Sequence, residues 1–123
     1  MLIRAIPVLH VSASKAAEKF YCDGLGFQQR FAWRPDEGKA DPCYMGLDRD
    51  GVLLHLSSFI GDGVAGGVAN FYVDDLEALH DEFRQRGVPI QVEPTDQEWG
   101  NREMYVEDPD GNSLRFVESR GDS

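Results

Sequence analysis

Residues 68–87 read VANFYVDDLEALHDEFRQRG, a β-rich segment followed directly by an amphipathic one. The stretch from Val68 to Val73 combines β-branched and aromatic residues, which predicts a strand. Asp74 or Asp75 can cap a helix after it. The apolar residues of that helix recur at helical spacing, at Leu76, Leu79 and Phe83. This stretch therefore predicts a strand followed by a helix.

Three short strands are predicted after this helix. Pro89 prevents the helix from continuing, and the β-rich segments that follow it are Ile90 to Val92, Arg102 to Glu107 and Ser113 to Val117. The last two are joined by Asp108-Pro109-Asp110-Gly111, a strong turn sequence. The second half of the chain thus has the order β-α-β-β-β.

The first half repeats this order. A strand from Ile3 to Val11 is followed by a helix that Ser14 can cap, and the next strands are Gln28 to Trp33, Cys43 to Asp48 and Val52 to Ser57. Aligning the halves pairs Gly26 with Gly87 and Asp50-Gly51 with Asp110-Gly111, a period of about 60 to 62 residues.

The repeat predicts an α+β fold in which two tandem β-α-β-β-β modules form a curved mixed sheet. We expect one domain over residues 1–123, with module 1 at 1–58, a glycine-rich hinge at 59–67 and module 2 at 68–123. The hinge contains a G-x-G-x-x-G pattern at 61–66. Because a strand and not a helix is predicted after it, we do not interpret it as a dinucleotide site.

Composition excludes several classes of function. The chain of 123 residues has a net charge of -10, which disfavours nucleic acid and anionic lipid as partners. No apolar run reaches the ~20 residues of a membrane-spanning helix, and no cleavage-site pattern follows Met1. We therefore expect a soluble cytoplasmic protein, with Cys22 and Cys43 reduced.

Strand alternation sorts the side chains onto two faces. The bulky residues expected to cover the helices are Leu9, Val11, Leu54, Leu56, Phe71, Val73, Leu114 and Phe116. The other face mixes apolar and polar residues, among them His10, His55 and Arg115. Such a face is typical of a ligand groove, and equally of a solvated surface.

Aromatic residues on strands and in one loop are candidates for stacking on a flat ligand. Trp99 is the strongest of them because it lies in the polar loop from Glu93 to Asn101. The predicted ligand-binding residues are Phe31, Trp33, Tyr44, His55, Asn70, Tyr72, Trp99, Arg102 and Arg115. Of these, Arg102 and Arg115 could receive an anionic or carbonyl group.

The chain resembles the glyoxalase/bleomycin resistance/dioxygenase superfamily, also called the vicinal oxygen chelate superfamily. The segments that carry this resemblance, in order, are Ile6-Pro7-Val8-Leu9, Phe20-Tyr21, Leu25-Gly26-Phe27, Asp75 to Leu79, Trp99-Gly100-Asn101-Arg102-Glu103 and Asp108 to Asn112. Within the superfamily, bleomycin resistance proteins are the most similar. In these, residues like Phe31 and Trp99 line the groove, whereas an aromatic residue is common where this chain has Asn70.

This resemblance implies a homodimer with partly exchanged strands and two ligand grooves. It also places the metal ligands of the catalytic members at positions that correspond to Ile6, His55, Val68 and Arg115. Ile6 and Val68 offer no donor atom and Arg115 is a permanent cation, so we predict no metal, no cofactor and no catalytic residue.

The sequence therefore favours a binding protein over an enzyme. We predict metal-free sequestration of a cationic, partly aromatic small molecule, foremost a bleomycin-type glycopeptide antibiotic, as in antibiotic resistance by stoichiometric binding. The alternative is a metal-dependent glyoxalase-like lyase, dioxygenase or thiol transferase of the same superfamily, with a metal held by His10 and His55.

Overall fold

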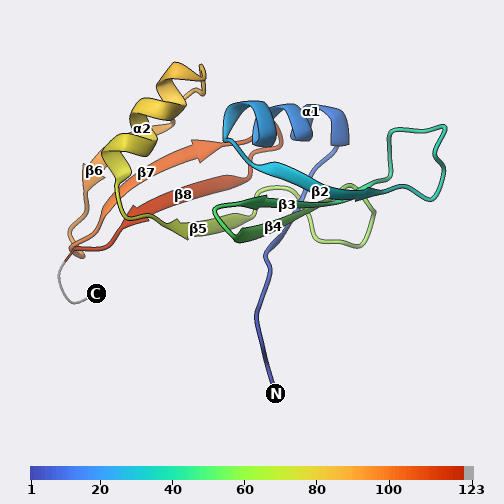
Figure 1. Cartoon of the computed structure of the whole chain (residues 1–123), viewed down its shortest axis with the longest axis horizontal. Helices are drawn as coiled ribbons and strands as arrows, with labels where there is room; N and C mark the ends of the chain where they lie inside the picture. Colours follow the sequence, from blue (N-terminus) through green and yellow to red (C-terminus); the bar gives the residue numbers. More distant parts are fainter. Residues whose placement is uncertain (121–123) are drawn as a thin grey trace.

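A computed structural model describes residues 1–120 and shows the repeat directly (Figure 1). The last three residues of the predicted second module, 121–123, lie outside the described residues. The first module contains β1 (Val8–His10), α1 (Ser14–Glu18), the π-helix η1 (Lys19–Gly24), β2 (Gln28–Trp33), β3 (Tyr44–Arg49) and β4 (Val52–Ser57). The second contains β5 (Val68–Tyr72), α2 (Leu76–Gln85), β6 (Val92–Asp96), β7 (Arg102–Glu107) and β8 (Ser113–Glu118).

Each module forms one four-stranded mixed sheet, and the two sheets have the same topology. Their strand orders are β1-β4-β3-β2 and β5-β8-β7-β6, with one parallel pair in each, β1 with β4 and β5 with β8. Paired turn glycines share their conformation: φ is 79° at Gly26 and 77° at Gly87, values that favour glycine. The predicted α+β class and the tandem repeat are confirmed.

Two local predictions were wrong. Ser14 does not cap the first helix, because Ala13 occupies the N-cap; instead, the Ser14 amide donates to the Asp41 carboxylate, at 3.1 Å and 3.3 Å from its two oxygens. The strand expected at Ile90 to Val92 lies at Val92–Asp96, where its pairing with β7 has a register shift. Both outcomes depend on contacts with distant segments, which local sequence patterns do not contain. At the second helix, Asp75 is the cap and accepts from the Ala78 amide at 3.1 Å.

The first strand is also shorter than predicted. Residues 3–7 belong to no strand, and the segment from Met1 to Ile3 is fully exposed. This segment projects from the body on the side of the sheets away from the helices (Figure 1).

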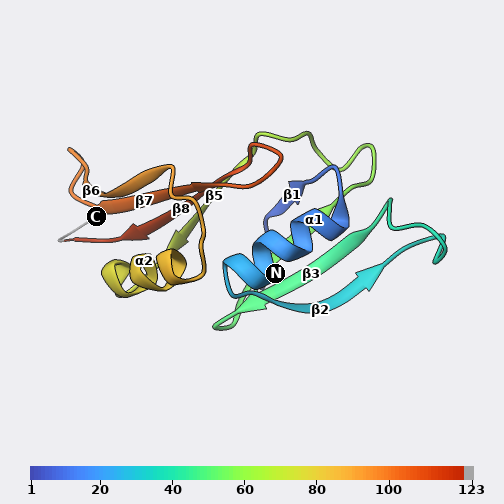
Figure 2. The same cartoon turned by 90° about the horizontal axis from the view of Figure 1, so that it is seen from above.

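Both helical segments lie on the same side of the two sheets (Figures 1 and 2), and one hydrophobic core runs beneath them. All the residues predicted to cover the helices belong to this core or pack against it. Aromatic rings continue it from one module to the next, since Phe27 meets Phe71 edge-on with ring centroids 6.0 Å apart. None of the helices within residues 1–120 is long and apolar enough to cross a membrane.

A buried polar junction ties the turn between β7 and β8 to the first module. Asn112 is fully buried, and both polar atoms of its side chain are hydrogen-bonded. Its Oδ1 accepts from the backbone amides of Gly66 and Gly67. Its Nδ2 donates to the His10 carbonyl and to the Asp108 carboxylate. The Asp108 carboxylate also accepts from the Tyr21 hydroxyl at 2.7 Å. Burial, and then the Asp108 charge, raise the pKa of Tyr21 far above its usual range, which keeps this hydroxyl a donor.

A second link joins the modules on the helix side. Arg49, at the end of β3, makes two bonds of 2.8 Å to the Glu82 carboxylate on α2 and donates to the Leu25 carbonyl at 2.7 Å. Because a β-carbon at Gly26 would lie 2.7 Å from Arg49 Nη1, the side chain can approach only where this residue is glycine.

We expect Asn112→Ala to lower the free energy of unfolding by about 2–4 kcal/mol, because it leaves the Gly66 and Gly67 amides and the His10 carbonyl without their buried partner. Asn70→Ala is the matched control, since Asn70 is exposed and should change stability by less than about 0.5 kcal/mol. Urea denaturation followed by circular dichroism measures both. Equal stabilities of the two variants would contradict the role of the junction.

Candidate functional site

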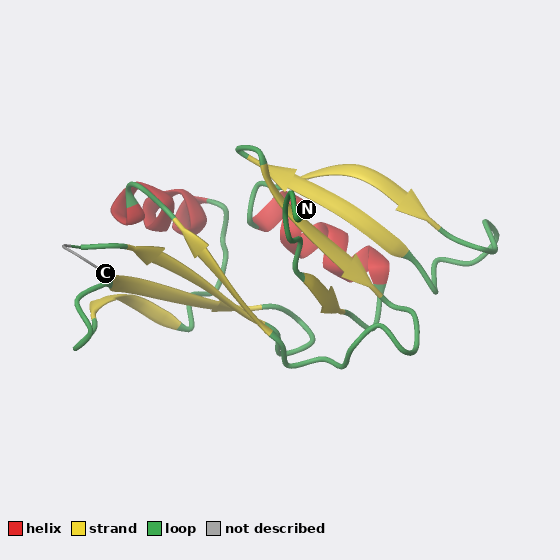
Figure 3. Ribbon diagram, turned by 90° about the horizontal axis from the view of Figure 1, so that it is seen from below, coloured by secondary structure: helices red, strands yellow, loops and turns green. Residues whose placement is uncertain are grey.

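Within residues 1–120, no helix covers the face of either sheet that is turned away from α1 and α2, which is the face seen from below in Figure 3. The strand residues that point away from the helices therefore form two open faces, one on each module. Large apolar side chains are exposed there, among them Trp33 at 57% and Tyr72 at 70%. Exposed aromatic side chains make these faces the candidates for an interaction site.

The open face of module 1 carries an aromatic cluster. Phe31 of β2 stacks on Tyr44 of β3 with centroids 6.2 Å apart, and meets the His55 ring of β4 edge-on at 5.5 Å. The Phe31 ring lies directly over Gly46, where an added β-carbon would come within 2.1 Å of the ring. The glycine thus lets the ring lie flat against the sheet and beside Tyr44.

His55 is held within this cluster as a neutral ring. The Tyr44 hydroxyl lies 2.8 Å from His55 Nδ1, and burial lowers the pKa of His55 below its usual range. A neutral imidazole can accept from the tyrosine hydroxyl, whereas an imidazolium cannot. Burial, followed by the Asp62 charge, raises the pKa of Tyr44, so that the hydroxyl also keeps its proton.

A second aromatic pair borders this cluster. Trp33 stacks on Phe59 of the hinge at a centroid distance of 5.6 Å. Asp62, also in the hinge, accepts from the Ser57 hydroxyl at 2.7 Å. Sequence reasoning missed Phe59 and Asp62 because it treated residues 59–67 only as a connector; an aromatic and an acidic residue among glycines were the available signal.

The open face of module 2 is more polar. Glu103 is only 6% exposed, and its carboxylate accepts from Trp99 Nε1 and from the Tyr105 hydroxyl, both at 2.7 Å. The hydrogen bond that the Tyr105 hydroxyl donates to Glu103, and then burial, raise the pKa of Tyr105. Arg115 places its guanidinium over the Tyr105 ring, 4.6 Å from the centroid. Tyr105 is one of the aromatic residues that the sequence places near the groove. Glu103 was absent from the predicted ligand-binding residues, although alternation along β7 puts it on the same face as Tyr105, away from Met104 and Val106.

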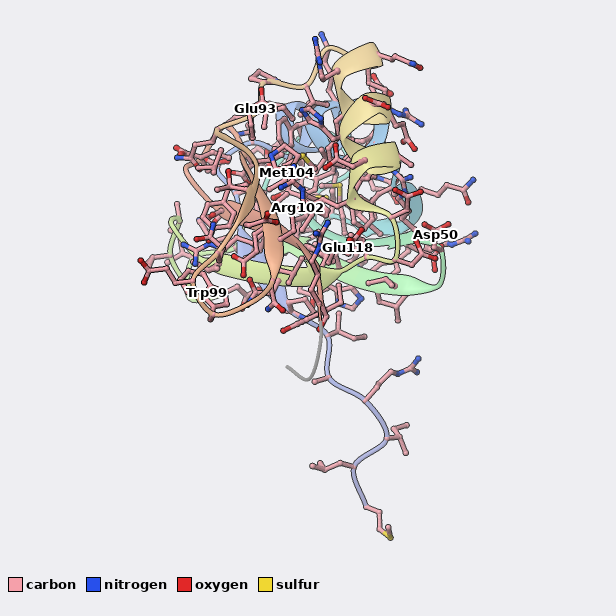
Figure 4. The ribbon with its side chains drawn as sticks, turned by 90° about the vertical axis from the view of Figure 1, so that its left-hand side faces the viewer. Asp50, Glu93, Trp99, Arg102, Met104 and Glu118 are labelled. Atoms are coloured by element: carbon pink, nitrogen blue, oxygen red, sulfur yellow. The ribbon has the colours of Figure 1, made fainter. Side chains whose placement is uncertain are left out.

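All of the predicted ligand-binding residues except Arg102 lie on the two open faces or border them. Arg102 lies on the side of α2, paired with Glu77 at 2.8 Å and with Asp96 at 3.1 Å. Figure 4 shows Arg102 and Met104 on the side of the sheet toward α2, and Trp99 at the opposite margin. Among the predicted ligand-binding residues, Arg102 therefore lies apart from the open faces, on the side of the helices.

A cleft of about 840 Å³ separates the two modules near the N-terminal segment. It is lined by residues 4–7, by Leu53 of β4 and by Asn70 and Tyr72 of β5. Two of the predicted residues, Asn70 and Tyr72, thus lie at the rim where this cleft meets the open face of module 2.

Two tandem β-α-β-β-β modules, each with one sheet face left open, define the class of fold to which this chain belongs. The chain belongs to the Glyoxalase/Bleomycin resistance protein/Dioxygenase superfamily, whose family model matches residues 7–116. None of the curated proteins compared with the chain matches it.

Solved structures with this fold include bleomycin-binding proteins. One, complexed with bleomycin, is 24% identical with a TM-score of 0.76 and covers 97% of this chain and 100% of its own. Another, from bleomycin-producing Streptomyces verticillus and complexed with copper(II)-bleomycin, is 27% identical with a TM-score of 0.71, covering 99% and 98%. A superfamily member from Sphaerobacter thermophilus is 23% identical, with a TM-score of 0.75 and coverage of 97% and 98%.

The residues at the superfamily's metal positions do not fit a divalent cation. Ile6 and Val68 carry no donor atom and the Arg115 guanidinium lies over Tyr105, so His55 is the one residue of the four that offers a ligand atom. His10 Nδ1 is buried without a hydrogen-bond partner. Within residues 1–120, no group of three or more His, Cys, Asp or Glu side chains is placed to hold a metal ion. The Glu118 carboxylate, a further possible ligand at the end of β8, instead accepts from the Leu76 amide at the start of α2.

The lowered pKa of His55 predicts a pH dependence of stability. An unfolded histidine titrates near pH 6.5, so below that pH the unfolded chain binds a proton that native His55 does not. We therefore expect the free energy of unfolding to fall as the pH drops from about 6.5 toward the lower native pKa. In His55→Asn this part of the slope should disappear. Denaturant titrations of both proteins between pH 7.5 and pH 5 measure the difference, and identical slopes would contradict a neutral, half-buried His55.

Proposed function

We propose that this protein binds and sequesters a partly aromatic small molecule without transforming it, with a cationic bleomycin-type glycopeptide as the leading candidate. The observation that carries this proposal is the aromatic cluster of Phe31, Tyr44 and His55 on an uncovered sheet face. Flat rings stack on such clusters with an energy beyond that of area burial alone. The resemblance to a protein complexed with copper(II)-bleomycin, at 27% identity, supports the choice of ligand.

Sequestration needs tight stoichiometric binding rather than a reactive group. The net charge of -10 would raise the encounter rate with a cationic ligand, and the burial of aromatic surface would slow its release. A bound antibiotic cannot reach its target, so resistance would follow from the amount of protein in the cytoplasm.

We propose further that a homodimer completes the groove. The open face of each module would be a half-site with an uncovered aromatic surface, and the exposed segment from Met1 to Ile3 pairs with no strand within residues 1–120. In a dimer, module 1 of one protomer can face module 2 of its partner, with the N-terminal segments crossing between them. The aromatic cluster and the Glu103–Arg115 face would then line opposite walls.

Titration with bleomycin tests the sequestration. Because Trp33→Phe leaves Trp99 as the reporter, its fluorescence should change at micromolar bleomycin with a stoichiometry of one ligand per chain. Phe31→Ala should weaken binding about tenfold or more, since it removes the central ring of the cluster. Ile60→Ser, which alters an exposed hinge residue, is the control and should bind as the parent does.

Two results would contradict the proposal. Absence of a Trp99 response at micromolar ligand would remove the antibiotic from consideration. Stoichiometric zinc, nickel, manganese or iron that only a chelator removes, and that His55→Ala abolishes, would contradict metal-free binding and favour the metal-dependent enzyme instead.

Sedimentation equilibrium tests the dimer. The full chain should sediment at twice its chain mass, and deletion of residues 1–5 should weaken association at least tenfold because the crossing segment is lost. Ile60→Ser serves again as the control. A monomer at concentrations of tens of micromolar would refute the dimeric groove.

A further inference from the structure

The central row of the second open face is built from three polar side chains in register. Asn70 of β5 pairs with Arg115 of β8, and Arg115 pairs with Tyr105 of β7. Residues opposite one another in a sheet project from the same face, so the amide, the guanidinium and the phenol lie side by side.

Arg115 lacks the acidic partner that other strand arginines have. Arg30 binds Asp48 at 3.1 Å and Arg102 binds Glu77 at 2.8 Å, whereas within residues 1–120 no carboxylate lies within 4.0 Å of the Arg115 guanidinium. Its only hydrogen bond there is from Nε to Ser113 Oγ, at 3.4 Å. Both terminal NH₂ groups thus remain available as donors on the half-buried face.

The nearby carboxylate does not neutralise this cation. Glu103 has one oxygen bound by Trp99 Nε1 and the other by the Tyr105 hydroxyl, at 2.7 Å each. Tyr105 stands between the two charges: its hydroxyl holds Glu103, and its ring supports Arg115. The guanidinium is therefore held in place by a neutral ring, with its donor edge free of protein oxygens.

Asn70 adds a second free donor group beside Arg115. Its side chain is exposed and makes no hydrogen bond to the other residues of the range 1–120. Two residues further along the same face of β5, the Tyr72 ring is 70% exposed.

We propose that Arg115 and Asn70 form a subsite for a planar oxyanion, such as a carboxylate, on a ligand whose aromatic part lies against Tyr72. The guanidinium fork would donate two parallel hydrogen bonds to the oxyanion and the Asn70 amide a third. This inference rests on the proposed small-molecule role and specifies a chemical class of ligand, an aromatic carboxylate.

Three matched probes test the subsite by isothermal titration calorimetry on the full chain: 2-naphthoate, 2-naphthamide and 2-(aminomethyl)naphthalene. They share the ring and differ in charge at pH 7. The carboxylate should bind about tenfold or more tightly than the neutral amide, and the ammonium should bind no better than the amide. This comparison needs no variant, so it does not depend on how substitutions affect folding.

Variants then assign the preference to residues. Arg115→Gln should abolish the preference for the carboxylate over the amide. Arg115→Lys should retain only part of this preference, because a point charge replaces the planar guanidinium. Asn70→Ala should weaken carboxylate binding severalfold. Arg30→Gln is the control, an arginine on a strand that is already paired. Equal binding of the three probes, carboxylate binding weaker than millimolar, or an unchanged preference in Arg115→Gln would overturn the subsite.

The bleomycin titration separates this inference from the proposed function. Binding of bleomycin without any preference for the carboxylate would refute the oxyanion subsite and leave sequestration standing. A carboxylate preference without bleomycin binding would remove the antibiotic as the ligand and leave the oxyanion subsite standing.

Discussion

The arrangement of the two modules depends on a fully satisfied polar junction in a place where unsatisfied groups would be costly. Asn112 contacts the first strand through His10, the hinge through Gly66 and Gly67, and its own turn through Asp108. Each of these bonds compensates for the desolvation of a buried polar group, so a displaced module would lose several at once. The junction, together with the Arg49–Glu82 pair, places the helices of both modules on one side and leaves both open faces on the other.

The two modules share one strand topology, but the side chains in the central row of their sheets differ in chemistry. In the first sheet this row consists of Val8, His55, Gly46 and Phe31; in the second it consists of Asn70, Arg115, Tyr105 and Val92. The first row is aromatic and carries no charge while His55 is neutral. The second offers a guanidinium and an amide. Two halves of one fold thus provide different surfaces, one for ring stacking and one for polar recognition.

The sequence predicted the features that depend on short periods. Alternation with a period of two placed Leu54 and Leu56 against the helices and His55 on the other face, because one face of each strand is buried. It did not predict the partners of Arg102, since Glu77 is 25 residues away and on a different element. Phe59 and Asp62 were missed for a similar reason: their roles depend on the path of the hinge, which brings Phe59 onto Trp33 and Asp62 to Ser57.

The net charge favours a cationic ligand, whereas the second open face favours an anionic group. The two preferences are compatible because they act at different distances from the protein. At physiological ionic strength the field of the surface carboxylates decays over about 8 Å, so it acts mainly on the approach of a cation. At contact, a charge-assisted hydrogen bond contributes about 1.5–3 kcal/mol, so the free donors of Arg115 dominate there. Aromatic stacking at Phe31 acts on the flat ring of the ligand and not on its carboxylate. A molecule with a flat ring, a carboxylate and a separate cationic group would satisfy all three, with the cation directed toward solvent and the acidic surface.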